Sequence, residues 1–267
     1  MPRSVKDPAR LLDGLVGYDP EDPVTALGIG MVEGSYTKYL DQRGLVGARI
    51  GILRESIGVQ SEPESEDFKK VDAVFEKNVA ELKAAGAVVI DPILIPNLKA
   101  LLARRANNPN NFEAGLKFYL ARNPNSPIKS HQDIANSPEL AKSFPPTKAD
   151  QWKNPPPTLD AARYLDYLQA REELMFNVLK VMADNKLDAI VHKTVEHQPT
   201  FIKDGINPPY SSNKGVPTWN TFLVYAGSMT VPSGFTTDNL PVGITFFGRP
   251  FSEPTLIKLA YTISISE

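Results

Sequence analysis

Hydrophobic positions at helical spacing alternate with short apolar runs along the first third of the chain. Residues 48–53 form an apolar run that is typical of a buried strand. From Phe68 to Leu82, apolar side chains recur at steps of three and four residues, and Gly86 follows as a typical helix stop. A second apolar run covers residues 87–90. This order predicts two parallel strands joined by a helix, and therefore an α/β protein.

The same kind of pattern continues toward the carboxyl terminus. A long helical pattern over residues 160–185 leads directly into an apolar strand at 187–191. Two closing strands at 229–232 and 242–248 are separated by turn residues, and Ser252 precedes a final helix. We therefore expect a mixed, largely parallel sheet that is covered by helices on both faces.

The first residues predict a short amphipathic helix. Asp7 and Pro8 are typical of a helix start, and Gly17 is typical of its end. The apolar face between them comprises Leu11, Leu12, Leu15 and Val16. Because no earlier element would cover that face, we expect a fold that is incomplete at its amino-terminal side. Residues 1–267 are predicted to form a single domain.

Composition narrows the functional classes. The chain has 267 residues, of which 42% are hydrophobic, which is enough for a buried core. Lys and Arg number 29 against 31 Asp and Glu, and this balance favours neither a nucleic acid nor an anionic membrane as partner. The absence of cysteine excludes thiolate nucleophiles and disulfides. No apolar run has the length of a signal or a membrane span, so we expect a cytoplasmic protein.

The histidines near residue 195 do not predict a metal site. His192 and His197 flank Glu196, but a separation of five residues would not place both rings on one face of a helix. We expect His192 at the end of the preceding strand. We expect His197 in the following loop, exposed and either hydrogen-bonded or simply solvated.

A serine-lysine pair is the nearest approach to a nucleophilic site in the sequence. Ser211, Ser212 and Lys214 lie close together, but no glycine run surrounds the serines to let a carbonyl group approach backbone amides. The pattern favours an ordinary polar loop, so the residues by themselves predict no catalytic group.

Several segments, in order along the whole chain, resemble the amidase signature family. SVKDPARLLDGLVGYDPEDP at 4–23 is similar to the helix and turn that follow the glycine- and serine-rich segment of that family. YLDQRGLVGARIGILRE at 39–55 and VAELKAAGAVVIDP at 79–92 resemble its strand, helix and strand. The most specific likeness is VPSGFTTDNLPVGITFFGRPFSEPTLIKLAY at 231–261, which resembles the terminal hairpin and helix of the family.

The resemblance implies hydrolysis of carbon-nitrogen amide bonds without a cofactor. In the family, a nucleophilic serine, a second serine in a cis peptide and a lysine relay protons. A segment of the Gly-Gly-Ser-Ser-Gly-Gly type carries the serines and supplies the backbone amides of the oxyanion hole. The sequence contains no such segment, so no catalytic residue can be assigned. We therefore expect a truncated carboxy-terminal portion that is inactive alone.

The remaining residues are expected to form sheet strands and walls of the acyl-side pocket. Trp219, Asn220 and Tyr225 are the candidate substrate-binding residues, and packing in the core is the competing interpretation for the two aromatic side chains. The full-length family acts on small-molecule amides. Alternatively, the chain pairs with a separate amino-terminal half, forms a homo-oligomer, or acts as a binding module that retains the pocket.

Overall fold

The computed structural model describes residues 4–105, 112–143, 153, 161–207, 213–223 and 225–264. The chain divides into two compact units. Unit 1 comprises residues 1–102, 172–199 and 213–267, and unit 2 comprises residues 103–171 and 200–212. The prediction of a single domain over residues 1–267 stays a prediction.

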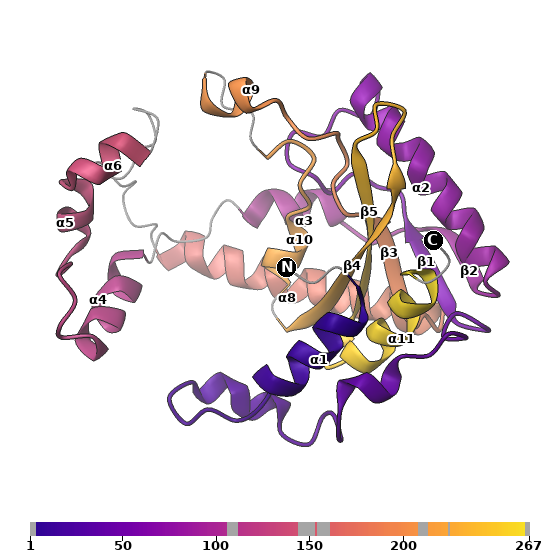
Figure 1. The fold of residues 1–267 in the computed structure, drawn as a ribbon, viewed down its shortest axis with the longest axis horizontal. Helices are drawn as coiled ribbons and strands as arrows, with labels where there is room; N and C mark the ends of the chain where they lie inside the picture. Colours follow the sequence, from indigo (N-terminus) through magenta and orange to yellow (C-terminus); the bar gives the residue numbers. More distant parts are fainter. Residues whose placement is uncertain are drawn as a thin grey trace. The chain divides into compact units, whose positions relative to one another are not determined.

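The sheet of unit 1 is mixed and has five strands in the order β2-β1-β3-β5-β4 (Figure 1). The strands are β1 (Arg49–Leu53), β2 (Val88–Ile93), β3 (Ala189–Lys193), β4 (Ala226–Phe235) and β5 (Pro241–Pro250). β1 pairs in parallel with β2 and β3, whereas β5 runs antiparallel to both β3 and β4. The mixed α/β sheet that the hydrophobic pattern predicts is thus confirmed.

Most of the described helices belong to unit 1. They are α1 (Lys6–Leu15), the 3-10 helices η1 (Pro23–Gly28) and η2 (Tyr36–Tyr39), α2 (Glu66–Ala84), α10 (Trp219–Phe222) and α11 (Glu253–Ser264). α3 (Leu98–Arg104) begins in unit 1 and ends in unit 2. α8 (Ala161–Asp184) begins in unit 2 and ends in unit 1, directly before β3. In the described part of the chain, no helix combines the length and the apolar character that crossing a bilayer requires.

Unit 2 contains short helices and the first part of α8. The short helices are α4 (Phe112–Arg122), α5 (His131–Ala135), α6 (Pro138–Ser143) and α9 (Ile202–Ile206). Ser130 and Asp133 form a reciprocal capping box at the start of α5. The guanidinium group of Arg104 pairs with Asp166 of α8 at 2.6 Å. Among its described residues, unit 2 contains no strand, and local contacts of this kind stabilise it.

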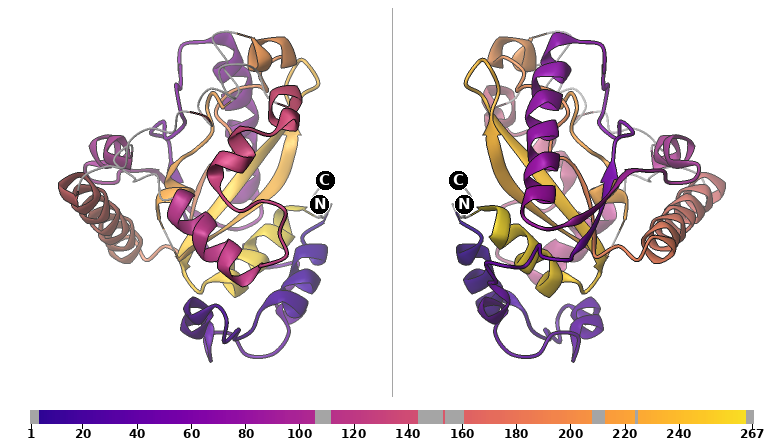
Figure 2. Two further views of the ribbon diagram at one scale, coloured as in Figure 1. Left: turned by 90° about the vertical axis from the view of Figure 1, so that its left-hand side faces the viewer. Right: turned by 90° about the vertical axis from the view of Figure 1, so that its right-hand side faces the viewer.

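α2 forms where the sequence predicts it and covers one face of the sheet. The Ser65 hydroxyl accepts a hydrogen bond from the Phe68 amide at 3.3 Å, which caps the first turn. Gly86 takes a φ of 93°, a conformation that glycine adopts without steric cost, and the chain turns there into β2. Figure 2 shows α2 lying along the strands. The predicted strand, helix and strand are therefore confirmed.

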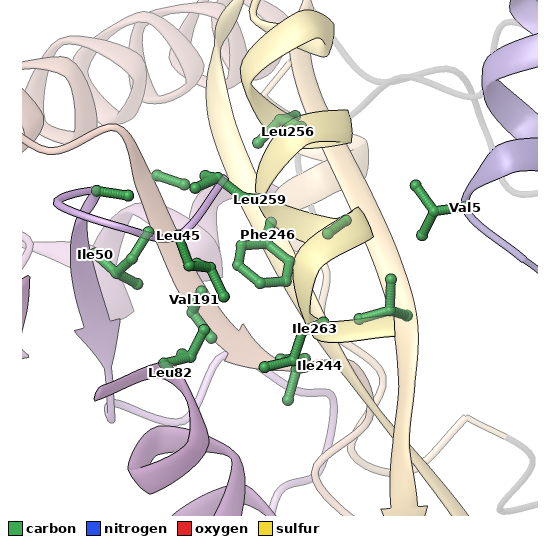
Figure 3. Close-up of a cluster of buried hydrophobic side chains, with 14 of the residues drawn as sticks. Val5, Leu45, Ile50, Leu82, Val191, Ile244, Phe246, Leu256, Leu259 and Ile263 are labelled. Carbon is green, nitrogen blue, oxygen red and sulfur yellow. The ribbon is translucent and has the colours of Figure 1, made fainter. Parts of the chain in front are cut away.

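α2 and α11 share one hydrophobic core against the sheet (Figure 3). Leu82 of α2 and Leu259 of α11 are buried with Phe246 of β5. Adjacent side chains of a strand point to opposite faces, so Phe247 lies on the other face. There it stacks on Trp219 of α10, with the ring centroids 4.4 Å apart. The sheet is thus covered on both faces.

The packing of the first helix differs from the prediction. α1 begins at Lys6 after Val5, so Asp7 is not its cap residue. Val5 and Ala9 enter the core shared with α11, whereas Leu15 is 70% exposed. Leu11 and Val16 are exposed as well. Spacing alone identified an apolar stripe, but of its four residues only Leu12 packs against the core.

β4 is longer than predicted and lies at the edge of the sheet. It includes Pro232, although a proline cannot donate a ladder hydrogen bond. An edge position tolerates this residue because one side of the strand needs no partner. Within the described residues, β4 pairs only with β5.

Candidate functional site

The carboxyl ends of β1 and β3 meet at a switch point of the sheet. The chain leaves β1 through α2 to reach β2 on one side, and β3 lies on the other side of β1. In open α/β sheets, ligands bind in the crevice outside such strand ends. Residues 54–62 follow β1 and residues 194–198 follow β3. These two segments form the candidate site together with residues 213–218.

Backbone hydrogen bonds join the three segments. The amide of Gly215 donates to the carbonyl of Val59 at 2.7 Å, and the amide of Val59 donates to Val216 at 3.1 Å. The amide of Glu196 donates to the carbonyl of Gly215 at 2.9 Å. Gly215 has a φ of 73°, and an added Cβ there would lie 2.8 Å from the backbone nitrogen of His197. The close approach of the loops therefore requires glycine at this position.

Glu196 is a buried carboxylate that holds the loop after β1. Its Oε1 accepts a hydrogen bond from the Ile57 amide at 2.7 Å, and its Oε2 accepts one from the Ser61 hydroxyl. Both partners belong to the segment that follows β1. Because a buried carboxylate requires such donors, Glu196 fixes the shape of this loop.

His197 is buried, so the prediction of a solvent-exposed ring is wrong. Its Nε2 accepts a hydrogen bond from the Glu62 amide at 2.9 Å, and its ring meets the edge of Phe68 at 5.6 Å. Burial, followed by the nearby charge of Lys214, lowers the pKa of His197. A neutral ring that accepts at Nε2 carries its proton on Nδ1, which faces the Ser65 hydroxyl at 3.5 Å.

Ser65 and His197 do not form a nucleophile and base. The Ser65 hydroxyl donates its proton to the carbonyl of Glu62 at 2.8 Å and accepts from the Phe68 amide as the cap of α2. His197 cannot take that proton, because its Nε2 is occupied and its Nδ1 carries hydrogen. The pair serves the structure of the loop.

Lys193 places a buried positive charge beside these loops. Its ammonium nitrogen lies 2.5 Å from Oδ1 of Asp72 and 4.1 Å from the ring centroid of Phe68. The carboxylate and the aromatic face together compensate for the loss of water around the charge. Lys193 therefore links the end of β3 to α2.

A row of hydroxyl groups crosses the sheet next to the site. The hydroxyl of Thr245 on β5 lies 2.9 Å from that of Thr194 and 2.8 Å from that of Thr230 on β4. Thr245 is buried, whereas Thr230 is exposed at the sheet edge. The row lies on the face that carries Phe247, opposite to α2 and α11.

The three predicted substrate-binding residues occupy different environments. Trp219 is 0% exposed, and its Nε1 donates to Nε2 of His192 at 3.2 Å. Asn220 donates to the Ser228 hydroxyl at 3.4 Å, while its buried Oδ1 has no partner among the described residues. Tyr225 is 56% exposed and lines a separate groove beside α1. The structure brings Trp219 and Asn220 together on α10, and their roles in binding stay predictions.

The remaining candidate groups have structural partners or lie outside the described residues. His192 is buried within β3, and its Nδ1 donates to the carbonyl of Lys193 at 2.8 Å. Lys214 pairs with Glu62 at 2.6 Å, whereas Ser211 and Ser212 lie outside the described residues. Among the residues that the structure describes, no three metal-ligating side chains gather into a group. The sequence did not reveal that Glu196 holds the loop after β1. Its position directly before His197 was the only sequence feature that pointed to this residue.

The sheet order and the polar strand ends define an α/β protein of the type that presents a ligand site at a switch point. The family profile described as Amidase matches residues 1–257. The chain therefore belongs to the amidase family.

Individual relatives show the same likeness. A probable amidase of Arabidopsis thaliana is 29% identical over 97% of this chain and 46% of its own length. A component of the glutamyl-tRNA(Gln) amidotransferase of Azorhizobium caulinodans is 27% identical over 98% of this chain and 52% of its own. The peptide amidase of Stenotrophomonas maltophilia superposes with a TM-score of 0.74 at 28% identity, over 99% of this chain and 52% of its own. The chain thus spans about half the length of these relatives.

Proposed function

We propose that this chain supplies the carboxy-terminal half of an enzyme that hydrolyses carbon-nitrogen amide bonds. In this proposal the nucleophile, the proton-accepting groups and the oxyanion donors come from a segment outside residues 1–267. The observation that carries it is the family match over residues 1–257 in a sequence without a Gly-Gly-Ser-Ser-Gly-Gly-type segment. Residues 1–267 alone are then inactive, because amide cleavage requires all of these groups together.

The geometry of the strand ends supports a binding role rather than a chemical one. Glu196 and His197 are saturated by hydrogen bonds to the loop after β1, and Ser65 caps α2. A wall held in this way keeps its shape while another segment performs the reaction. We propose that the wall continues through Asn220, whose buried Oδ1 has no hydrogen-bond partner among the described residues and can accept a hydrogen bond from an amide N–H group.

The edge of the sheet supports pairing with the other half. Within the described residues, β4 offers unpaired backbone groups along one side, and Phe235 at its end is 63% exposed. Open edges of this kind accept a further strand. The relatives carry about as many residues again as this chain covers, so an amino-terminal half is the occupant that we propose. A second copy of the chain, paired through the same edge, is the alternative.

Complementation in trans tests the proposal. The chain is purified alone and after co-expression with the amino-terminal half of the Stenotrophomonas maltophilia peptide amidase. Hydrolysis of a peptide amide is expected only from the combined halves. The matched control replaces the serines of the glycine-rich segment in the added half by alanine, which is expected to abolish hydrolysis. Turnover by the chain alone would contradict the proposal.

A further inference from the structure

A groove in unit 1 lies apart from the strand ends described above. Its volume is about 880 Å³, which falls within the range of small-molecule sites. The lining residues come from the end of α1, from η1 and η2, and from the first residues of β4 and α11. None of them belongs to the candidate site at β1 and β3.

The walls of the groove are largely apolar and aromatic. The aliphatic lining includes Leu15, Val24 and Ile29, all of which are exposed. Tyr225 and Phe251 contribute aromatic rings to the lining. A contiguous exposed apolar surface of this kind is typical of a binding site.

The charged groups of the groove are all negative. Asp13 and Glu253 are the ionisable carboxylates in the lining, which includes no Lys, Arg or His among the described residues. Asp13 already accepts hydrogen bonds from the Tyr36 amide at 2.6 Å and from the Ser35 hydroxyl at 2.5 Å. The side chain of Glu253, by contrast, has neither a hydrogen bond nor an ion pair to any described residue. Its Oε1 lies close to Gly227, where an added Cβ would be 3.4 Å away.

Tyr36 adds a phenol to the lining of the groove. The residue is only 6% exposed and lines the groove. Burial raises the pKa of Tyr36, and the charges of Glu253 and Asp13 raise it further. Asp13 accepts a hydrogen bond from the Tyr36 amide, so this carboxylate lies beside Tyr36, and a phenol in the lining suits a ligand with a hydrogen-bonding head.

We propose that this groove binds a small organic cation, namely a protonated primary amine on an apolar body. The ammonium group pairs with the Glu253 carboxylate and donates to the Tyr36 hydroxyl, while Tyr225 and Phe251 contact the apolar part. An aromatic wall beside a carboxylate suits an ammonium group through both charge pairing and cation–π attraction. The inference does not depend on the proposed amide hydrolysis.

Titration calorimetry of the intact chain tests this inference at pH 7 with phenethylammonium as the probe. Phenethyl alcohol, which has the same body without the charge, is expected to bind about fivefold more weakly. Glu253→Gln is expected to weaken binding of the amine by a similar factor and to leave binding of the alcohol unchanged. Glu172→Gln, which removes an exposed carboxylate outside both the groove and the candidate site, is the matched control.

Three results would overturn the inference. They are equal binding of the amine and the alcohol, no binding of the amine, and equal loss of binding in both glutamine variants. Sedimentation of the same samples adds a further check. If binding of the amine required a dimer of the chain to dissociate, the groove would be the contact surface for a second copy of the chain. The inference would then be wrong.

Discussion

Replacing Trp219 distinguishes a core residue from a pocket wall. The side chain is fully buried, stacks on Phe247 and donates a hydrogen bond to His192. Truncation of a buried tryptophan to alanine costs about 3–5 kcal/mol through lost burial and the remaining cavity. The His192 Nε2 atom would also lose its donor, which costs about 1–3 kcal/mol for a buried group. Trp219→Ala is therefore expected to lower the free energy of unfolding by at least about 4 kcal/mol.

Urea unfolding followed by far-ultraviolet circular dichroism measures this loss. Trp219→Phe retains a ring against Phe247 but removes the indole N–H group, so it is expected to cost about 1–3 kcal/mol. Tyr225→Ala removes an exposed aromatic side chain and is expected to change stability by less than about 0.5 kcal/mol. A Trp219→Ala variant as stable as the parent chain would refute the assignment of this residue to the core.

Further predictions concern pH, a buried carboxylate and association. Burial lowers the pKa of His192 to about 4, so the unfolded chain binds a proton between pH 6.5 and 4 that the folded chain does not. The contribution of His192 to the free energy of unfolding therefore falls by about 3 kcal/mol as the pH drops through that interval. In His192→Gln, the free energy of unfolding should lack this part of its dependence on pH. Glu196→Gln places an amide where two donors converge and should lower the thermal midpoint at a cost of about 1–3 kcal/mol, whereas Glu55→Gln should leave it unchanged. The chain alone should associate in light scattering, and Phe235→Lys at the β4 edge should shift it toward monomer more than Phe201→Lys does; a clean monomer would contradict the open edge.

The sequence predicted the elements whose pattern is local. The steps of apolar residues from Phe68 to Leu82 and the glycine at 86 defined α2 to within two residues at either end. The apolar runs beside it became β1 and β2, and the closing strands became β4 and β5. These predictions succeed because helix and strand periodicity follow from the backbone itself.

The burial of polar residues after β3 could not be predicted in the same way. His197 receives its hydrogen bond from Glu62, which is 135 residues away in the sequence. Glu196 and Lys193 likewise depend on partners from the segment after β1 and from α2. A local pattern carries no information about which distant backbone group will desolvate a side chain, so an exposed loop was the natural expectation.

The candidate binding residues show the same limit. The sequence around Trp219 could not decide between a pocket wall and the core for this side chain. The decision depends on Phe247, which alternation places on the face that α10 covers. Tyr225 takes a φ of 73°, a conformation that sequence patterns rarely reveal for a tyrosine.

Labelling with a fluorophosphonate, a reagent that modifies activated serines, tests the central claim most directly. Intact mass spectrometry is performed on the purified chain and on the chain combined with an amino-terminal half of a relative. The account predicts no label on residues 1–267 in either sample and a single label on the added half. A stoichiometric label at one serine of this chain would show that it carries its own nucleophile, and would contradict the account.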